Sequence, residues 1–170
     1  MDEKSISKIT FGPKVSLDMK DKKILEVLQK NARLPVSRIA KKVEMPADSV
    51  KYRIKRLEKL GVIRLYHAVL NFPLLGHPMY NYTLFSLFAM GESKEKEFVN
   101  FLISEPKITW ITKTSGKWDF IIGICAKDFK ELDELLQRIR IKFVKHIRDY
   151  ETISTIDEYK FDFMYDIIEV

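Results

Sequence analysis

The chain has 170 residues, of which 46% are hydrophobic and 32% charged, and its formal net charge is +6 at pH 7. This composition excludes an intrinsically disordered chain, and the length allows one medium domain or two small ones. A single cysteine, Cys125, excludes an internal disulfide framework, and no run of 18 apolar residues indicates a membrane span. Residues 1–16 are polar, carry no signal-peptide pattern and are expected to form an arm, so we expect a cytoplasmic protein with no membrane partner.

Positive charge is concentrated in the first part of the chain. Residues 1–70 hold 17 Lys and Arg against 8 Asp and Glu, whereas residues 71–170 hold 13 against 16. A basic module is therefore joined to a mildly acidic one, as expected when only one half binds a polyanion. Residues 71–78 contain two prolines and a glycine and are predicted to be the linker between them.

Three short amphipathic helices are predicted in the basic module. The first begins near Asp18, whose carboxylate can accept a hydrogen bond from an unpaired backbone N–H. Pro35 suits the first turn of the second helix, because its missing N–H would be unpaired there anyway. Residues 44–46 break the chain before the third helix, and Gly61 ends that helix in a left-handed conformation.

The three helices are followed by residues 62–69, which are β-branched and roughly alternating, so a strand or wing is predicted there. This order is typical of a winged helix-turn-helix domain over residues 17–70, and it makes double-stranded DNA the first candidate partner. The alternative is an ordinary solvated basic helix.

The third helix turns Val50, Ile54 and Leu57 inward, which leaves a basic face outward. In a helix-turn-helix, the first residues of this helix reach base edges and later ones reach phosphates. We therefore expect Asp48, Ser49 and Tyr52 to read bases, and Lys55, Arg56 and Lys59 to contact the backbone, with Lys51 on the same face.

The second module alternates strand and helix. Strands are predicted over residues 80–90, 108–115, 118–126 and 147–156, and helices over 94–103 and from Asp128 to about 145. Gly116-Lys117 joins the middle strands in a hairpin. This βαββαβ order predicts a ferredoxin-like domain over residues 79–170, with an antiparallel sheet and both helices on one face. The whole chain is thus predicted to be α+β.

The sheet carries more apolar surface than one helix layer can bury, so its uncovered face is expected to pair with another subunit. The side chains on which this expectation depends are Phe85, Leu87, Ile111, Ile122 and Ile124. The C-terminal residues 161–168 also alternate, which predicts an extra edge strand or an arm onto a neighbour.

The chain resembles the leucine-responsive regulatory protein (Lrp/AsnC) family over about residues 17–156. The resemblance implies a winged helix-turn-helix, an effector-binding ferredoxin-like domain, homodimers with facing sheets, and often higher homo-oligomers around which DNA wraps. Two places depart from the family pattern: Glu44 and Pro46 replace the usual Gly and Ser of the turn, and Pro35 stands where Ser is usual. The matching residues are Leu17-Asp18, Asp21, Ile24-Leu25, Leu28-Gln29, Asn31-Ala32-Arg33, Ile39-Ala40, Val43, Arg53-Ile54, Arg56-Leu57-Glu58, Gly61-Val62-Ile63, Tyr66, Ala68, Leu70-Asn71, Ser115-Gly116 and Asp119.

In that family, a Gly-x-x-Asp loop and the segment after the last helix line an amino-acid pocket between subunits. The resemblance therefore implies an effector site at Ser115, Gly116 and Asp119, with Thr152, Ser154 and Thr155 as weaker candidates. Gly116 would let a ligand approach the backbone, and Asp119 could pair with an α-ammonium group. The alternative is that Gly116 only makes a hairpin turn, which Asp119 fixes.

Enzymatic chemistry finds little support. His67, His77 and His146 are scattered without partners at metal-ligand spacing, and no phosphate loop or nucleophile motif occurs. We expect no catalytic residue, metal or cofactor. The competing hypothesis to a sequence-specific regulator is an architectural protein that binds DNA with little sequence preference and no effector.

Overall fold

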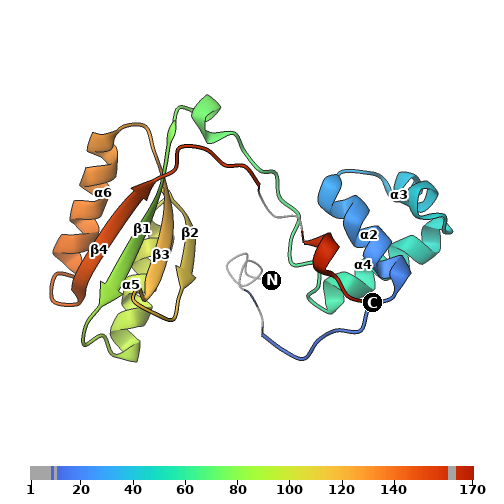
Figure 1. The fold of residues 1–170 in the computed structure, drawn as a ribbon, viewed down its shortest axis with the longest axis horizontal. Coiled ribbons are helices and arrows are strands. Elements are labelled where there is room, and N and C mark those ends of the chain that lie inside the picture. The colour runs from blue at the N-terminus through green and yellow to red at the C-terminus, as the bar shows by residue number, and fades with distance from the viewer. Residues whose placement is uncertain (1–8, 10, 161–163) are drawn as a thin grey trace. The chain divides into compact units, whose positions relative to one another are not determined.

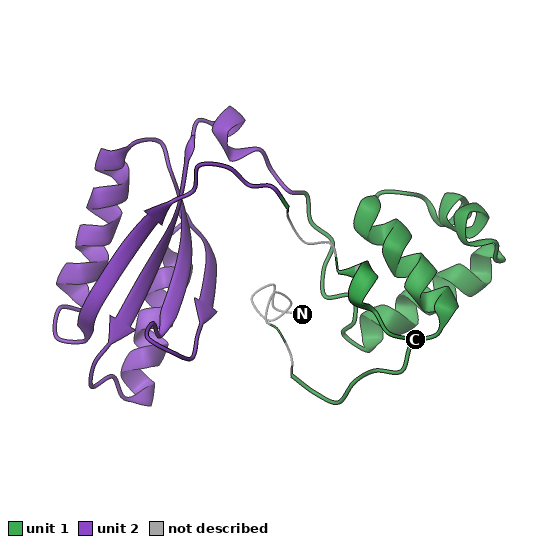
Figure 2. Ribbon diagram, in the orientation of Figure 1, with its two compact units in different colours: residues 1–68, 160–170 green, residues 69–159 purple. Residues whose placement is uncertain are grey.

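A computed structural model describes residue 9, residues 11–160 and residues 164–170 of the chain. The chain divides into two compact units, residues 1–68 with 160–170 and residues 69–159 (Figure 2). The division therefore falls just before the predicted linker, which belongs to the second unit. The C-terminal segment, assigned from the sequence to the second domain, clusters with the first unit instead.

In the described part of the first unit, three α-helices pack around one small core (Figure 1). They are α2 (Met19–Lys30), α3 (Val36–Val43) and α4 (Ala47–Lys59). Ile24 of α2, Ile39 of α3 and Val50 and Leu57 of α4 are all fully or almost fully buried. The helix spacing predicted from the sequence is confirmed, with the apolar stripe of each helix facing the other two.

The helix ends explain how the turn tolerates its unusual residues. Pro35 and Pro46 are the N-cap residues of α3 and α4, one position before the first turn that was predicted for Pro35. Glu44 adopts a left-handed conformation, with φ of 55°, at the C-cap of α3. The glycine usual in this turn is therefore replaced by a residue that must bear the strain of that conformation.

Gly61 closes α4 as expected. Its φ is +71°, its N–H donates to the Glu58 carbonyl at 3.0 Å, and the N–H of Val62 donates to the Leu57 carbonyl at 3.0 Å. These are the two bonds of a Schellman motif, which satisfy carbonyls that the helix end would leave unpaired.

Residues 62–69, which were predicted to form a strand or wing, contain no strand. Its residues beyond position 63 are exposed, and none pairs with any of the described strands. The alternating β-branched pattern indicates extended backbone, but a strand also requires a neighbour with which to form hydrogen bonds.

The second unit is a four-stranded sheet with two helices. After a 3-10 turn at Phe72–Leu75, the elements are β1 (Met79–Leu87), α5 (Glu92–Ser104), β2 (Ile108–Lys113), β3 (Phe120–Ala126), α6 (Phe129–Lys142) and β4 (Ile147–Ser154). All pairs are antiparallel, in the order β2-β3-β1-β4. The predicted ferredoxin-like βαββαβ fold is confirmed, and the Asp128 side chain caps α6 by accepting from the Glu131 N–H.

Both helices cover the same face of the sheet. Phe98 of α5 makes edge contacts with Phe85, Phe120 and Phe143, and all four rings are buried. The side chains predicted to face another subunit lie here: Phe85, Ile122 and Ile124 are buried under the helices, and Leu87 and Ile111 pack against them. That prediction named the wrong face, because β1 and β3 are apolar on both faces and alternation alone cannot tell which one the helices cover.

The opposite face of the sheet is covered by no helix of this unit. Phe72, Tyr80, Tyr82 and Trp110 form a row of rings with centroids 5.2–6.0 Å apart. Tyr80 lies so close to Gly123 of β3 that a Cβ atom there would be 2.4 Å from its hydroxyl. Trp110 keeps 44% and Ile153 50% of their surface exposed.

The C-terminal segment forms no edge strand where it is described. Residues 161–163 lie outside the described part, and Tyr165–Ile167 is a single 3-10 turn. Ile168 packs against the core of the first unit, and its carbonyl accepts from Lys22 Nζ of α2 at 2.8 Å. The described part of this segment thus contacts this chain's own helical unit, and the arm onto a neighbour stays a prediction.

Candidate nucleic-acid interface and effector site

The exposed side of α4 carries most of the expected DNA-contacting residues. Lys51, Tyr52, Lys55 and Lys59 are exposed, Tyr52 to 70%. Asp48 is also exposed and Ser49 half-buried, both in the first turn of the helix. This arrangement puts short polar side chains and a tyrosine at the N-terminal end and ammonium groups along the rest, as base reading followed by phosphate contact requires.

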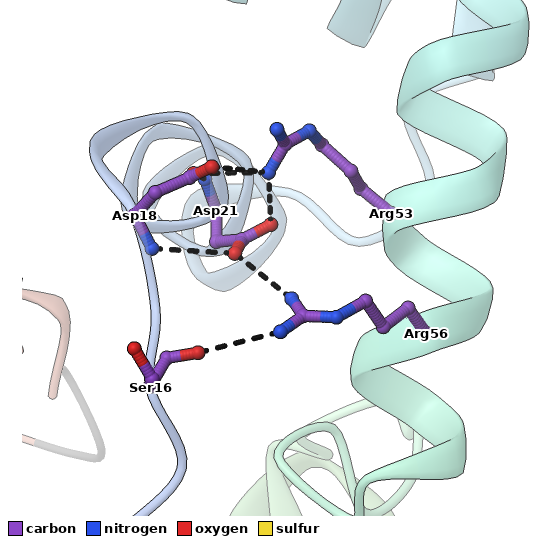
Figure 3. A network of polar contacts seen from close by, with 5 residues as sticks. All are labelled: Ser16, Asp18, Asp21, Arg53 and Arg56. Atoms are coloured by element: carbon purple, nitrogen blue, oxygen red, sulfur yellow. Dashed lines mark hydrogen bonds and ion pairs between the residues drawn. The ribbon is translucent and has the colours of Figure 1, made fainter.

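Arg56 differs from the other six, because it is part of a network of polar contacts (Figure 3). Its Nη1 lies 3.1 Å from Asp21 Oδ2, and its Nη2 donates to the Ser16 carbonyl at 3.4 Å. Arg53, one turn earlier, lies 2.7 Å from Asp21 Oδ1 and 2.8 Å from Asp18 Oδ2. Two arginines of α4 thus hold the start of α2.

Burial makes the Asp21 carboxylate depend on this network. The Asp21 side chain is only 2% exposed, and a buried carboxylate is costly unless cations and hydrogen bonds replace water. The pKa of Asp18 is lowered, chiefly by its hydrogen bond from the Asp21 backbone and then by Arg53. The pKa of Arg53 is raised mainly by its hydrogen bond to Asp21. Sequence reasoning missed this role, although each helix has its charged pair at i, i+3 spacing.

A groove of about 740 Å³ opens beside this network. Tyr52, Ser49 and Asp48 line it from α4, and the start of α2 lines it from the other side. The guanidinium groups of Arg53 and Arg56 and the carboxylates of Asp18 and Asp21 therefore border the expected base-reading residues, so the groove is polar and mixed in charge.

Tyr66 connects the end of α4 to the segment that follows. Its hydroxyl donates to Glu58 Oε1 at 3.0 Å. Partial desolvation of the half-exposed phenol, and then that hydrogen bond, raise the pKa of Tyr66 to about 12. The phenol therefore remains neutral and able to donate at any physiological pH.

The expected effector loop lies between β2 and β3. Ser115 and Gly116 are exposed, and Gly116 has φ of +147°, which a side chain rarely tolerates. Asp119 follows them and is half-buried: its Oδ2 accepts from the Leu87 N–H at 2.6 Å, and its own N–H donates to the Phe85 carbonyl at 2.8 Å. Asp119 therefore ties the hairpin to β1 at the point where the register between β1 and β4 shifts.

A cavity of about 260 Å³ adjoins Asp119. Glu95 and Lys113 line it as a mutual ion pair at 2.6 Å, and Ala89 lines it with a left-handed backbone, φ 49°. One carboxylate oxygen of Asp119 already accepts a hydrogen bond from the backbone of β1, which leaves the other oxygen for a ligand. The cavity therefore combines this oxygen with an ion pair and a strained turn.

The weaker effector candidates do not join Asp119 within one subunit. The Thr152 hydroxyl bonds Thr83 at 3.0 Å, and Ser154 Oγ donates to Asn81 Oδ1 at 2.8 Å. Thr155 pairs with Tyr80 through its backbone. These residues lie on β4 and just beyond it, beside the start of β1, whereas Asp119 contacts the end of β1. Asn81 and Leu87 are six residue steps apart along β1, which is about 20 Å.

Two family models match the chain. Residues 17–64 match a winged helix-turn-helix DNA-binding domain, and residues 85–164 match the Lrp/AsnC ligand-binding domain. The chain belongs to the Lrp/AsnC family. Its function is that of a DNA-binding transcriptional regulator, as the resemblance predicted, and the α+β fold of winged helix-turn-helix and ferredoxin-like parts is confirmed.

Relatives of this Lrp/AsnC chain agree with the family models. It is 35% identical to the HTH-type transcriptional regulator FL11 of Pyrococcus furiosus, over 72% of this chain and 80% of that one. It is 27% identical to the leucine-responsive regulatory protein of Rhizobium meliloti, over 86% and 94%. An AsnC family regulator from Agrobacterium tumefaciens has the same fold, with TM-score 0.80, 24% identity and coverage of 90% and 100%.

A second structural neighbour was solved with a ligand. It is a Neisseria meningitidis transcriptional regulator in complex with L-Met, with TM-score 0.79 and 20% identity, covering 90% of this chain and 100% of that one. At this identity the likeness concerns the fold alone. Within the described part of the Lrp/AsnC chain, no helix is long and apolar enough to cross a membrane, and no three potential metal ligands cluster.

Proposed function

We propose that the protein binds specific DNA sites through the exposed side of α4. Tyr52, Ser49 and Asp48 read base edges, and Lys51, Lys55 and Lys59 contact phosphates. The observation that carries this proposal is the division of labour on α4: its two inner arginines are bound by Asp21, while its lysines and Tyr52 are exposed. Arg56 is assigned to holding the helix, with phosphate contact as a secondary role.

Selection from a random-sequence DNA pool at fixed salt tests the proposal. Wild-type protein should enrich a defined motif, and Tyr52→Ala should lose enrichment at one or two positions while it keeps its affinity for bulk DNA. Equal affinity for random and selected DNA would instead favour the architectural alternative.

The effector proposal is an amino acid bound at the Asp119 cavity. The free oxygen of Asp119 would accept from the α-ammonium group, and Lys113 would attract the carboxylate when released from Glu95. Thr152, Ser154 and Thr155 can contribute only from elsewhere in an assembly, because they lie at the other end of β1. Calorimetry against the twenty amino acids tests this, and no heat with any of them would refute it.

The subunit proposal is a homodimer formed through the open face of the sheet. One line of residues crosses the sheet on this face: Trp110 of β2, Gly123 of β3, Tyr82 of β1 and Ile153 of β4. Burial of these aromatic and aliphatic side chains against a second subunit is more favourable than their exposure to water. We infer that the protein acts in the cytoplasm by binding DNA and effector, without catalysis of its own.

A further inference from the structure

The C-terminal segment, residues 164–170, lies on the helical unit as a bound peptide would. Ile168 is half-buried against the core that α2, α3 and α4 share. Its carbonyl accepts from Lys22 Nζ at 2.8 Å, and the Met164 N–H donates to Gln29 Oε1 at 3.1 Å. The segment therefore contacts α2 near both ends of that helix, with one apolar anchor between polar contacts.

The residues on either side of Ile168 contribute little to docking. Lys14 pairs with Glu169 at 2.6 Å, but both side chains are more than 70% exposed, so this ion pair adds little. Ile167, next to the anchor, is 71% exposed. Docking thus depends chiefly on Ile168, and adjacent isoleucines provide an internal comparison.

Docking of residues 164–170 changes how many stretches of chain connect the two units. The chain leaves the first unit near residue 68, forms the whole second unit, and returns near residue 160. With the segment docked, two stretches of chain connect the units, and with it released, only one does. Because the segment is attached, its effective concentration at α2 is on the order of millimolar, so even a weak contact stays largely formed yet remains reversible.

We propose that residues 164–170 are a reversible second tether, docked on α2 through Ile168, that limits how the DNA-binding unit can be oriented. This proposal rests on the DNA-binding function proposed above. In a dimer, two tethered units would hold their α4 helices at a restricted separation, and so would discriminate between operators by the distance between half-sites. Releasing the segment would relax that discrimination.

Hydrogen exchange of the full chain tests docking without any DNA. We compare wild type, Ile168→Asp and the matched control Ile167→Asp. In Ile168→Asp the α2 amides should exchange at least several-fold faster than in wild type, and in Ile167→Asp they should not. Equal exchange in the two variants would overturn the proposal, and Ile168→Leu should restore protection.

Binding to paired half-sites tests the tether. Wild type should prefer one spacing over another shifted by half a helical turn, about 5 bp, by roughly ten-fold, and Ile168→Asp should reduce this ratio toward one at equal single-site affinity. An unchanged ratio with faster α2 exchange would overturn the tether role. A wild type that binds no DNA would refute the proposed function, while the exchange result would still decide docking.

Discussion

A single buried carboxylate decides which charges on α4 are available to DNA. Asp21 accepts both Arg53 and Arg56, so two of the five cations on that helix are committed inside the protein. Counting basic residues in the sequence therefore overestimates the interface. The three lysines are separated from this network and exposed, which makes them the better candidates for phosphate contact.

Replacement of Lys55 measures one such contact. Lys55→Ala should weaken binding to every DNA sequence and reduce the slope of log affinity against log salt by about 0.9, since one phosphate contact releases about that many counterions. Titrations at four or five salt concentrations give the slope. Lys130→Ala, an exposed lysine of α6, is the control and should change neither quantity.

Asp119 has two separable tasks, and Asp119→Asn distinguishes them. The asparagine retains a carbonyl oxygen for the Leu87 N–H but loses the charge proposed to pair with an α-ammonium group. Effector affinity should fall about ten- to a hundred-fold, with the melting temperature nearly unchanged. Calorimetry and thermal unfolding report the two effects. A large loss of stability with unchanged effector affinity would make Asp119 purely a structural residue.

At the scale of elements, the sequence predicts the features that depend on local pattern. It does not predict the features that depend on contacts with other elements. The three helices, the hairpin at Gly116 and the start of α6 at Asp128 follow from local spacing, and all are present. Residues 62–69 have strand composition, but among the described residues no strand lies beside them. Which face of the sheet is covered, and where the C-terminal segment docks, depend on contacts between elements distant in sequence. No local periodicity encodes such contacts.

The contact between α2 and α4 should respond strongly to loss of Asp21. Asp21→Ala leaves two arginines without their shared anion and should destabilise the helical unit by roughly 1–3 kcal/mol, less than for a fully buried pair because both arginines keep some water contact. Urea unfolding followed by circular dichroism measures the change. Glu26→Ala, which breaks a solvent-exposed pair with Lys30 on the same helix, should cost much less than Asp21→Ala.

The same contact should weaken in acid through Asp18. Its pKa in the folded protein lies below the ordinary 3.8, so it contributes stability that is present above 3.8 and lost as the pH falls through the lowered value. The difference in stability between wild type and Asp18→Asn should be largest near neutral pH and vanish in strong acid. A difference that stays constant with pH would contradict an ionic role for Asp18.

At the scale of the whole molecule, the open face of the sheet offers exposed apolar side chains, among them Trp110 and Ile153, that no helix of its unit covers. Ile153→Arg should convert dimers to monomers, because a charge would be buried in the proposed interface at a cost of several kcal/mol. Sedimentation at micromolar concentration measures the shift. Phe129→Arg replaces an even more exposed apolar residue, 73% against 50%, on α6, and should leave the assembly intact.

The return of the chain to its first unit also changes how the protein can be divided. In terms of connectivity, the ferredoxin-like unit is an insertion within the helical one, between residues 68 and 160 (Figure 2). A fragment cut at residue 68 would expose the surface that Ile168 covers, whereas a short Gly-Ser bridge from residue 68 to residue 160 would retain that cover. A minimal DNA-binding module of this protein is therefore better obtained by excising its middle than by removing its end.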